Sequence, residues 1–390
     1  MPETSGQSKS DGLLSRAVSI DLEVGRNDGR IRQFAAVRRE NGDSFTFSGG
    51  KLQPALKRLD QFVDGAGYLV GHNIADFDSK HLAAANPGLW LLNLPLVDTL
   101  RLNPLCFPRN PYHHLVKHYQ DAGLKRAQLN DPKLDAELTL ELLQDQYQAL
   151  VELHASDPNL ALALHWLTTV EEDSTGTESL FAEVRQSSRP TLQEAQSAIR
   201  QRFEGAVCST HVEQLLGQLE ANPWSMAYAI SWLSVAGGNS VVSPWVRHTF
   251  PATMRIIQLL RDSACTAPSC HWCRTRHDAR GELERWFGFE SFRPAPVDED
   301  GHPLQQAIVE AAMAGQHVLG ILPTGTGKSV CYQVPALSRY DKTGSITVVI
   351  SPLVALMSDQ VAGLESKGIS SCAALNGLLS MPELSLIHIS

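Results

Sequence analysis

The sequence lacks long apolar runs, a surplus of basic residues and enough cysteines for a disulfide framework. No stretch of about 18 uncharged apolar residues occurs, so no membrane-spanning helix and no membrane partner are expected. The 33 Lys and Arg residues stand against 42 Asp and Glu residues, and the net charge of -9 argues against a uniformly basic surface for nucleic acid. A local basic groove stays compatible with this charge.

Seven cysteines in 390 residues are too few for a disulfide framework. A chain of this length is long enough for two or three domains. The first residues, "MPETSGQSKSDG", have neither the basic start nor the apolar core of a secretory signal. We therefore expect a cytoplasmic protein with reduced thiols, and a disordered N-terminus over residues 1–15.

Strand and helix signals alternate over residues 16–150, which predicts an α/β domain. "RAVSIDLEV", "IRQFAAVRRE" and "GYLVGHN" are typical of strands, whereas "LQPALKRLDQFV" and "DAELTLELLQDQYQALVELH" have helical spacing. Residues 151–244 predict a mostly helical linker region, with loops rich in Ser, Thr, Gly, Glu and Pro.

Acidic residues recur in the α/β domain at places where they could meet. Asp21 and Glu23 in "SIDLEVG" lie two apart on a predicted strand, so their side chains share one face. Two carboxylates on one face suit a pair of divalent metal ions that promote in-line attack on a phosphodiester. Taken alone, the pair fits an exposed strand of alternating charge better. Asp78 in "GHNIADFDSKHL" and Asp135 in "NDPKLDAELTLELL" change that balance.

With "SIDLEVG", "GHN…FD" and "LDAELT", residues 16–150 resemble the DnaQ-like 3′-5′ exonucleases of the DEDD superfamily. The resemblance implies a ribonuclease-H-like sheet flanked by helices. It also implies that two Mg²⁺ or Mn²⁺ ions are held by the catalytic residues Asp21, Glu23, Asp78 and Asp135, with Asn73 in the same pocket.

The general base of that family is missing from its usual place. The histidine branch has its base five residues before the last aspartate, where this chain has Asn130, and the tyrosine branch uses the next position, here Asp131. General-base catalysis contributes about 10²- to 10⁴-fold. Either a histidine of "NPYHHLVKHY" (His113, His114 or His118) substitutes in space, or the domain is slow or only binds strands.

The segment 245–283 contains "CTAPSCHWCRTRH", a cluster that predicts a metal knuckle. Three thiolates and one imidazole, from Cys265, Cys270, Cys273 and His277, form a closed tetrahedral set suited to structural Zn²⁺. Unrelated free thiols, or an iron–sulfur cluster completed by Cys208, are the alternatives. The stretch 245–293 holds 8 Arg against 5 Asp and Glu, 8 - 5 = +3, which suits either a DNA contact or a solvated basic face.

The stretch "PTGTGKS" lies between the predicted strand "HVLGIL" and the apolar "VCYQVPAL", which is the setting of a phosphate-binding loop. Gly325 and Gly327 let backbone N–H groups turn toward phosphates, Lys328 can reach the β and γ phosphates, and the Ser329 hydroxyl can bind Mg²⁺. The strict motif fails at its first glycine, which is Leu322 here.

The flanks "RWFGFESFRP", "LQQAIVEAAMAG" and "TVVISPLVALMSDQVAGL" make residues 284–380 resemble the RecQ family of DNA helicases. The resemblance implies an incomplete first RecA-like lobe over residues 284–381, with "SITVVI" as a buried parallel strand. It also implies ATP as cofactor, a DNA single strand or junction as partner, and a role in DNA repair or recombination. The implied nucleotide-binding residues are Gln305, Thr324, Gly325, Thr326, Gly327, Lys328 and Ser329.

The sequence departs from that family in two places. "APVDEDGH" is inserted before Gln305, and the motor's Asp-Glu-x-His box, second lobe and arginine are missing. The ending "LSLIHIS" does not resemble the family, so residues 382–390 are expected to be a non-native tail and the chain is expected not to unwind DNA alone. A helicase fused to an exonuclease and a strand-binding protein serving a motor both remain open. "SPLVALMSDQ" disfavours a small-molecule kinase.

Overall fold

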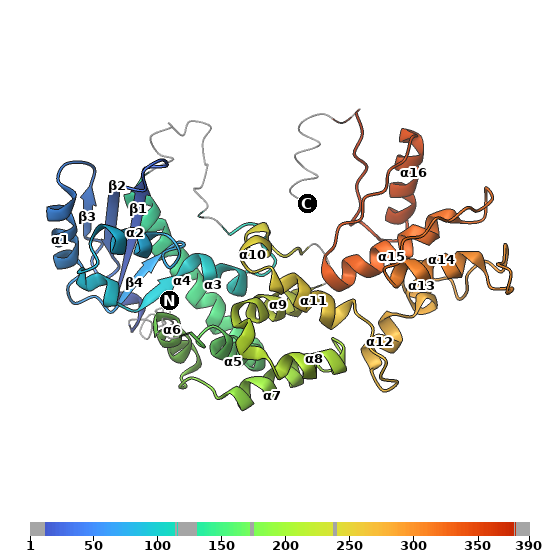
Figure 1. Ribbon diagram of the computed structural model, residues 1–390, viewed down its shortest axis with the longest axis horizontal. Helices are drawn as coiled ribbons and strands as arrows, with labels where there is room; N and C mark the ends of the chain where they lie inside the picture. The colour runs from blue at the N-terminus through green and yellow to red at the C-terminus, as the bar shows by residue number, and fades with distance from the viewer. Residues whose placement is uncertain are drawn as a thin grey trace, which may run out of the picture. The chain divides into compact units, whose positions relative to one another are not determined.

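The computed structural model describes residues 12–113, 115, 131–171, 175–236, 240–377 and 379, which form two compact units (Figure 1). The first unit runs up to Arg202 and also includes Gln218–Ser231 and Ser243–Phe250. The second contains Phe203–Gly217, Trp232–Val242 and the residues from Pro251 onward. This division follows how the chain packs and does not test the domain ranges predicted from the sequence, which stay predictions.

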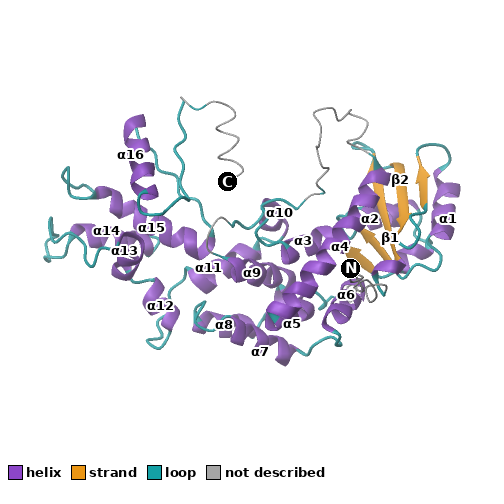
Figure 2. Ribbon diagram, turned by 180° about the vertical axis from the view of Figure 1, so that it is seen from behind, coloured by secondary structure: helices purple, strands orange, loops and turns teal. Residues whose placement is uncertain are grey.

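A five-stranded mixed sheet forms the first part of unit 1, in the order β3-β2-β1-β4-β5 (Figure 2). β1 pairs antiparallel with β2 and parallel with β4, which in turn pairs parallel with β5. β1 is the central strand of the sheet. Its first four residues are buried, as expected for a strand that is covered on both faces. The strands are β1 (Ala17–Val24), β2 (Ile31–Arg38), β3 (Ser44–Phe47), β4 (Tyr68–Gly71) and β5 (Leu96–Asp98).

The long helix α4 (Pro132–Ser156) packs against β1 and β2. Its start is set locally: Asp131 accepts hydrogen bonds from the backbone N–H groups of Lys133 and Leu134, and Pro132 takes the first helical position. The other helices of this unit are α1 (Leu52–Phe62), α2 (Asp78–Ala85), α3 (Thr99–Cys106), α5 (Pro158–Leu167), α6 (Thr175–Arg185), α7 (Leu192–Arg202), α9 (Pro223–Val235), which ends in unit 2, and α10 (Pro244–Thr249).

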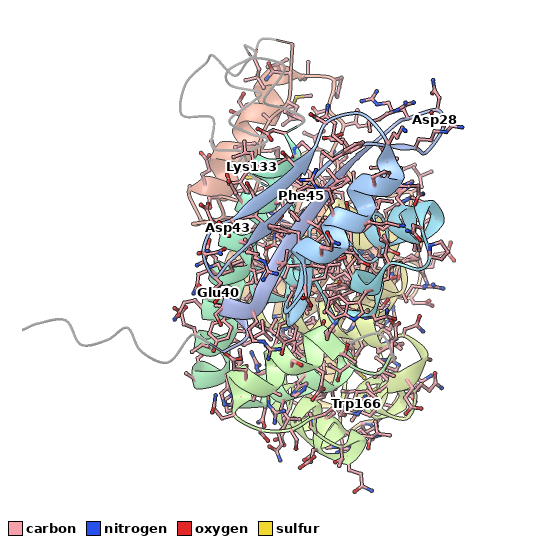
Figure 3. All side chains as sticks on the ribbon, turned by 90° about the vertical axis from the view of Figure 1, so that its left-hand side faces the viewer. Asp28, Glu40, Asp43, Phe45, Lys133 and Trp166 are labelled. Atoms are coloured by element: carbon pink, nitrogen blue, oxygen red, sulfur yellow. The ribbon has the colours of Figure 1, made fainter. Side chains whose placement is uncertain are left out.

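Aromatic and aliphatic side chains fill the core beside the sheet. Phe34 on β2 is fully buried, and its ring lies 5.2 Å from that of Phe47 and 5.8 Å from that of Phe45 (centroid distances). Phe45, labelled on the sheet in Figure 3, also packs against Phe62 of α1. Because burial of each aromatic ring removes a large apolar area from water, this cluster fixes α1 against the sheet.

Unit 2 is helical in the residues that the structure describes. Its core joins α13 to the helices that flank the glycine loop, through Leu283, Val309, Val334 and Leu337. The helices are α8 (Ser209–Leu216), α11 (Ala252–Arg261), α12 (His271–Arg276), α13 (Ala279–Phe287), α14 (Leu304–Met313), α15 (Lys328–Thr343) and α16 (Val354–Glu365).

Two strand predictions in this unit are wrong. "HVLGIL" and "SITVVI" form no strand, and they expose Leu319 by 89%, Ile346 by 81% and Ile350 by 92%. A strand requires a partner for its backbone N–H and C=O groups, and the described part of unit 2 supplies no paired strand to either segment. Of the predicted RecA-like lobe, the structure thus contains the helices and the glycine loop.

The mixed α/β class with a helical majority is confirmed, whereas a ribonuclease-H-like exonuclease fold stays a prediction. The strand and helix predictions between residues 16 and 113 agree with β1, β2, α1 and β4. Among the described helices, none is long and apolar enough to cross a membrane. Most of the predicted disordered N-terminus and the whole predicted tail lie outside the described residues.

Candidate functional site

Three acidic side chains of unit 1 converge as the sequence predicted. Asp21 and Glu23 project from the same face of β1, and Asp135 lies in the first turn of α4, which packs on that strand. One carboxylate oxygen from each of the three lies within 4.8 Å of those of the others. Hard carboxylate oxygens at this separation can bind one or two divalent cations.

Asp78, the fourth predicted acid, lies beside this group but is not part of the set within 4.8 Å. It begins α2, is only 3% exposed, and its Oδ1 accepts a hydrogen bond of 3.1 Å from the backbone N–H of Leu22. The pKa of Asp78 is raised to about 7, mainly by burial and also by the nearby charges of Asp98 and Glu23, against the opposite effect of the hydrogen bond from Leu22. The side chain thus ties α2 to β1 between the two strand acids.

Asp98 is a buried acid that the sequence interpretation missed. It ends β5 and caps α3, and it accepts hydrogen bonds from the backbone N–H groups of Leu100 and Arg101. It also accepts from the N–H groups of Asn73 and Ala75, which fixes the turn after β4. Asn73 has a φ of 71°, so this predicted pocket residue lies in a turn held from β5. An aspartate directly before a helix was the available signal.

The predicted replacements for the general base have different outcomes. Asn130, His114 and His118 lie outside the described residues. His113 is 3% exposed, and its Nδ1 lies 3.1 Å from Nδ2 of Asn103 on α3. The carboxylate of Asp131 caps α4. Both described candidates therefore already have structural partners, and the identity of a base stays a prediction.

The glycine loop of unit 2 has the backbone that the motif requires. Gly325 and Gly327 have φ angles of 84° and 78°, in the left-handed region that favours glycine, and Gly327 precedes the first residue of α15. The Lys328 ammonium donates to the carbonyl oxygens of Leu322 (3.1 Å) and Pro323 (3.4 Å). Ser329 follows in the first turn of α15, so the hydroxyl and the helix N-terminus lie beside the loop.

Gln305, in the first turn of α14 and 5% exposed, holds the glycine loop in place. Its Nε2 donates to the carbonyl oxygens of Gly327 (2.9 Å) and Thr326 (3.3 Å), and its Oε1 accepts from the backbone N–H of Arg293. A Cβ atom on Gly327 would lie 2.8 Å from Gln305 Nε2. These hydrogen bonds connect Gln305 with the glycine loop, so the predicted nucleotide-binding residues lie together. Thr324 is included because it is part of the loop. The Thr326 hydroxyl closes the loop by donating to Pro323 O (2.7 Å).

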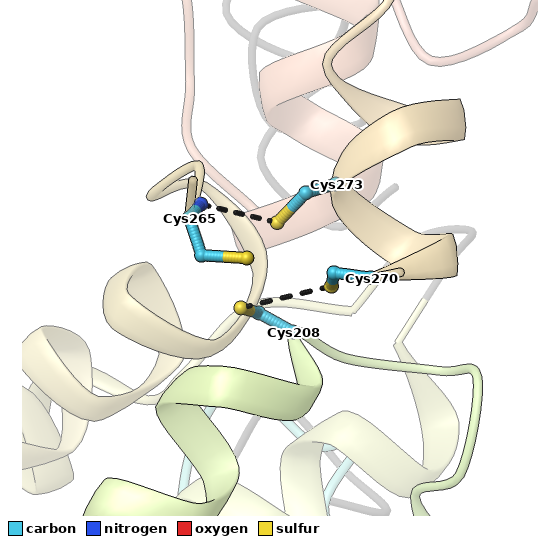
Figure 4. A group of neighbouring side chains, drawn as sticks. All are labelled: Cys208, Cys265, Cys270 and Cys273. Atoms are coloured by element: carbon cyan, nitrogen blue, oxygen red, sulfur yellow. Dashed lines mark hydrogen bonds between the residues drawn. The ribbon is translucent and has the colours of Figure 1, made fainter. Parts of the chain in front are cut away.

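The cysteine cluster forms, but with a different fourth member. Sulfur atoms of Cys208, Cys265, Cys270 and Cys273 all lie within 4.8 Å of one another (Figure 4). His277, the predicted fourth ligand, is not in this group, and its place is taken by Cys208, the fourth thiolate of the iron–sulfur alternative. The physical reason is that α12, which carries Cys273, ends at Arg276, so His277 lies beyond the helix. Cys208 is held in place by its backbone N–H, which donates to Leu260 O at 2.8 Å.

The His277 imidazole faces other charged groups instead. Its pKa is lowered to about 4, mainly by burial and also by the positive charge of Lys342, against the opposite influence of Asp262. The neutral ring is therefore the stable form at neutral pH. His277 thus belongs to the packing between α12 and α15.

Comparison with known proteins identifies the C-terminal region. Residues 302–384 match the DEAD/DEAH box helicase family. The chain is 42% identical over 108 residues to the ATP-dependent DNA helicase RecQ of Bacillus subtilis, covering 28% of this chain and 16% of that relative. It is 34% identical over 146 residues to the rat ATP-dependent DNA helicase Q1, covering 35% of this chain and 21% of that protein. The C-terminal region is related to the RecQ family of helicases.

The RecQ-like region includes the glycine loop and Gln305 described above. A third relative, the RecQ helicase of Haemophilus influenzae, is 43% identical over 89 residues, covering 23% of this chain and 12% of its own. The chain spans less than a quarter of the length of each of these relatives. No solved structure matches the chain.

Proposed function

We propose that this chain is part of an ATP-dependent DNA helicase of RecQ type, fused to a metal-dependent 3′-5′ exonuclease, which acts in DNA repair or recombination. ATP and a divalent ion serve the glycine loop, and a DNA single strand or junction is the partner. The similarity of residues 302–384 to helicases supports the first half. One observation carries the second half: the carboxylates of Asp21, Glu23 and Asp135 converge within 4.8 Å.

The donor set fits divalent cations. Three carboxylates that lie so close repel one another unless positive charge is placed between them, and oxygen ligands suit Mg²⁺ or Mn²⁺. When bound, such ions supply an activated water and stabilise the charge that develops on the phosphate. The chain's own contribution is to hold Asp21 and Glu23 on a paired strand and Asp135 on a capped helix, so that the oxygens are fixed before DNA binds.

The test is degradation of a labelled single strand by the purified chain with Mn²⁺. We expect shortening from the 3′ end, and a loss of at least about 100-fold in rate for Asp21→Asn and Glu23→Gln, because each removes a metal-binding charge. Asp145→Asn, an exposed change on the same helix as Asp135, is the matched control and should retain the full rate. Equal rates in all four proteins would rule out the proposed nuclease site.

A second candidate function is strand binding without cleavage. Two observations favour it: Asn130 stands where the family has its base, and the Asp131 carboxylate is engaged as a helix cap. In the same experiment, this alternative gives no shortening by the native chain, together with metal-dependent retention of the labelled strand that Asp21→Asn abolishes. Either outcome leaves the assignment of the RecQ-like region unchanged, because the glycine loop is in the other unit.

A further inference from the structure

We propose that Cys208, Cys265, Cys270 and Cys273 bind a single zinc ion, and that this ion fixes α12 for its contacts with the glycine-loop helix α15. The inference rests on the arrangement of unit 2 and is independent of the proposed nuclease activity. It assigns the fourth ligand to a cysteine far upstream in the sequence.

The sulfur separations match a mononuclear tetrahedral site. With Zn–S bonds of about 2.3 Å, tetrahedral geometry places two thiolates about 3.8 Å apart. The sulfurs of Cys208 and Cys270 are 3.9 Å apart, and the whole set lies within 4.8 Å. A four-iron cluster places iron and sulfide between its thiolates, and so needs them farther apart than a single ion does. The geometry therefore selects zinc over an iron–sulfur cluster.

The surroundings of the sulfurs also suit a structural ion. The backbone N–H of Cys265 donates to Cys273 Sγ at 3.3 Å, a hydrogen bond that stabilises a thiolate ligand (Figure 4). Cys208 and Cys270 are buried to 0% and 1% exposure, and Cys273 to 8%. Four soft ligands from a largely buried position leave no open coordination place, which is characteristic of structural zinc.

The chain brings the upstream ligand into place through backbone contacts. Beside the hydrogen bond from Cys208 N–H to Leu260 O, the Arg261 side chain donates to Ala206 O at 3.2 Å. The Trp272 indole N–H on α12 donates to Arg261 O at 3.0 Å. The chain between Cys208 and Cys265 forms a long loop. Closing this loop costs chain entropy, which metal binding offsets in the folded state.

The site is joined to the nucleotide-binding element by charge pairs. Arg276, at the end of α12, forms an ion pair with Asp341 near the end of α15 and another of 3.2 Å with Glu282, which is 1% exposed. Asp262, between α11 and Cys265, pairs with the buried Lys342 at 3.4 Å. Because buried charges are costly without their partners, displacement of α12 would destabilise the C-terminal end of α15.

The test compares metal content by elemental analysis after purification and dialysis. We expect one zinc ion per chain in the native protein and in His277→Ala, and loss of most of the zinc from Cys208→Ser, because three thiolates hold the ion more weakly than four. Cys331→Ser, a buried cysteine outside the cluster, is the matched control and should retain zinc. Zinc retained by Cys208→Ser but lost from His277→Ala would overturn the proposal, as would iron with visible absorption.

A spectroscopic readout covers the case in which Cys208→Ser fails to fold. The native chain, stripped of metal and titrated with Co²⁺, should show thiolate-to-cobalt absorption of the strength given by four sulfur ligands, unchanged in His277→Ala. A native chain that binds neither Co²⁺ nor Zn²⁺ contradicts the site. Chelation should also lower the unfolding temperature of the native chain; an unchanged temperature contradicts the proposed support of α15.

Discussion

The acidic site is predicted on an apolar strand and the glycine loop directly after one, and only the strand of the acidic site forms in the structure. β1 carries Asp21 and Glu23, and it pairs with a strand on each side. The segments 317–322 and 345–350, which flank the glycine-loop helix, are equally apolar but unpaired and exposed. The apolar composition of a segment thus shows that it can be buried, whereas a strand forms only where neighbouring strands pair with its backbone N–H and C=O groups.

The two sites consequently depend on different supports. In unit 1 the sheet core holds β1, which carries Asp21 and Glu23, and the buried Asp98 holds the turn between β4 and Asp78. In unit 2 the loop is held by glycine backbone geometry, by the Gln305 side chain and by the helices on either side. Substitutions in the two places should therefore have unequal consequences.

The largest expected effect is in the sheet core. Phe34→Ala removes a fully buried ring and should lower the free energy of unfolding of unit 1 by about 3–5 kcal/mol. Ile350→Ala, at a 92% exposed apolar position, should change stability by less than about 0.5 kcal/mol. Urea unfolding followed by circular dichroism measures both. A large loss for Ile350→Ala would mean that the segment is paired in solution, and the comparison would fail.

The next effect concerns the glycine loop. Gly327→Ala forces a side chain into a left-handed backbone, and against Gln305 Nε2 at 2.8 Å, which costs about 1–3 kcal/mol. We expect ATP affinity, measured by calorimetry, to fall at least about tenfold. Gly363→Ala on α16 is the matched control, because an added Cβ meets nothing within 4 Å there. Equal affinities for the two variants would show that the loop does not need its observed backbone.

The smallest effect is the pH dependence of unit 2. The folded-state pKa of His277 is lowered to about 4 from an ordinary value near 6.5, so its contribution to stability is present above about pH 6.5 and is lost as the pH falls toward 4. Solvent screens this partly exposed ring, so we expect a loss of about 1 kcal/mol between about pH 7 and pH 5.5.

His277→Gln should remove that part of the pH dependence, measured by denaturant unfolding in the presence of Zn²⁺. Cys331→Ser should keep the slope of the native chain, because its side chain does not change charge in this pH range. If His277→Gln leaves the slope unchanged, the ring is not held neutral in the folded state.

Local sequence signals predicted much of what the structure shows. "PTGTGKS" predicts the left-handed glycines at 325 and 327, and the helix predicted from Asp135 forms as α4, which begins three residues earlier at Pro132. Such features depend on a few neighbouring residues, so a short pattern contains the necessary information. The same local reasoning could have predicted Asp98 as a helix cap. Its hydrogen bonds to the turn after β4 could not be predicted in this way, because they involve a distant segment.

By itself, the sequence determined β1, β2, β4, α1 and most of α4, together with the three converging acids, the glycine loop and three of the four clustered cysteines. Only the tertiary structure decided that Cys208 and not His277 completes the cluster, that Asp98 holds the turn after β4, and that two apolar segments stay unpaired. These outcomes depend on contacts between residues far apart in the chain. Such contacts are fixed by packing and by the pairing of backbone groups across elements, which no local pattern encodes.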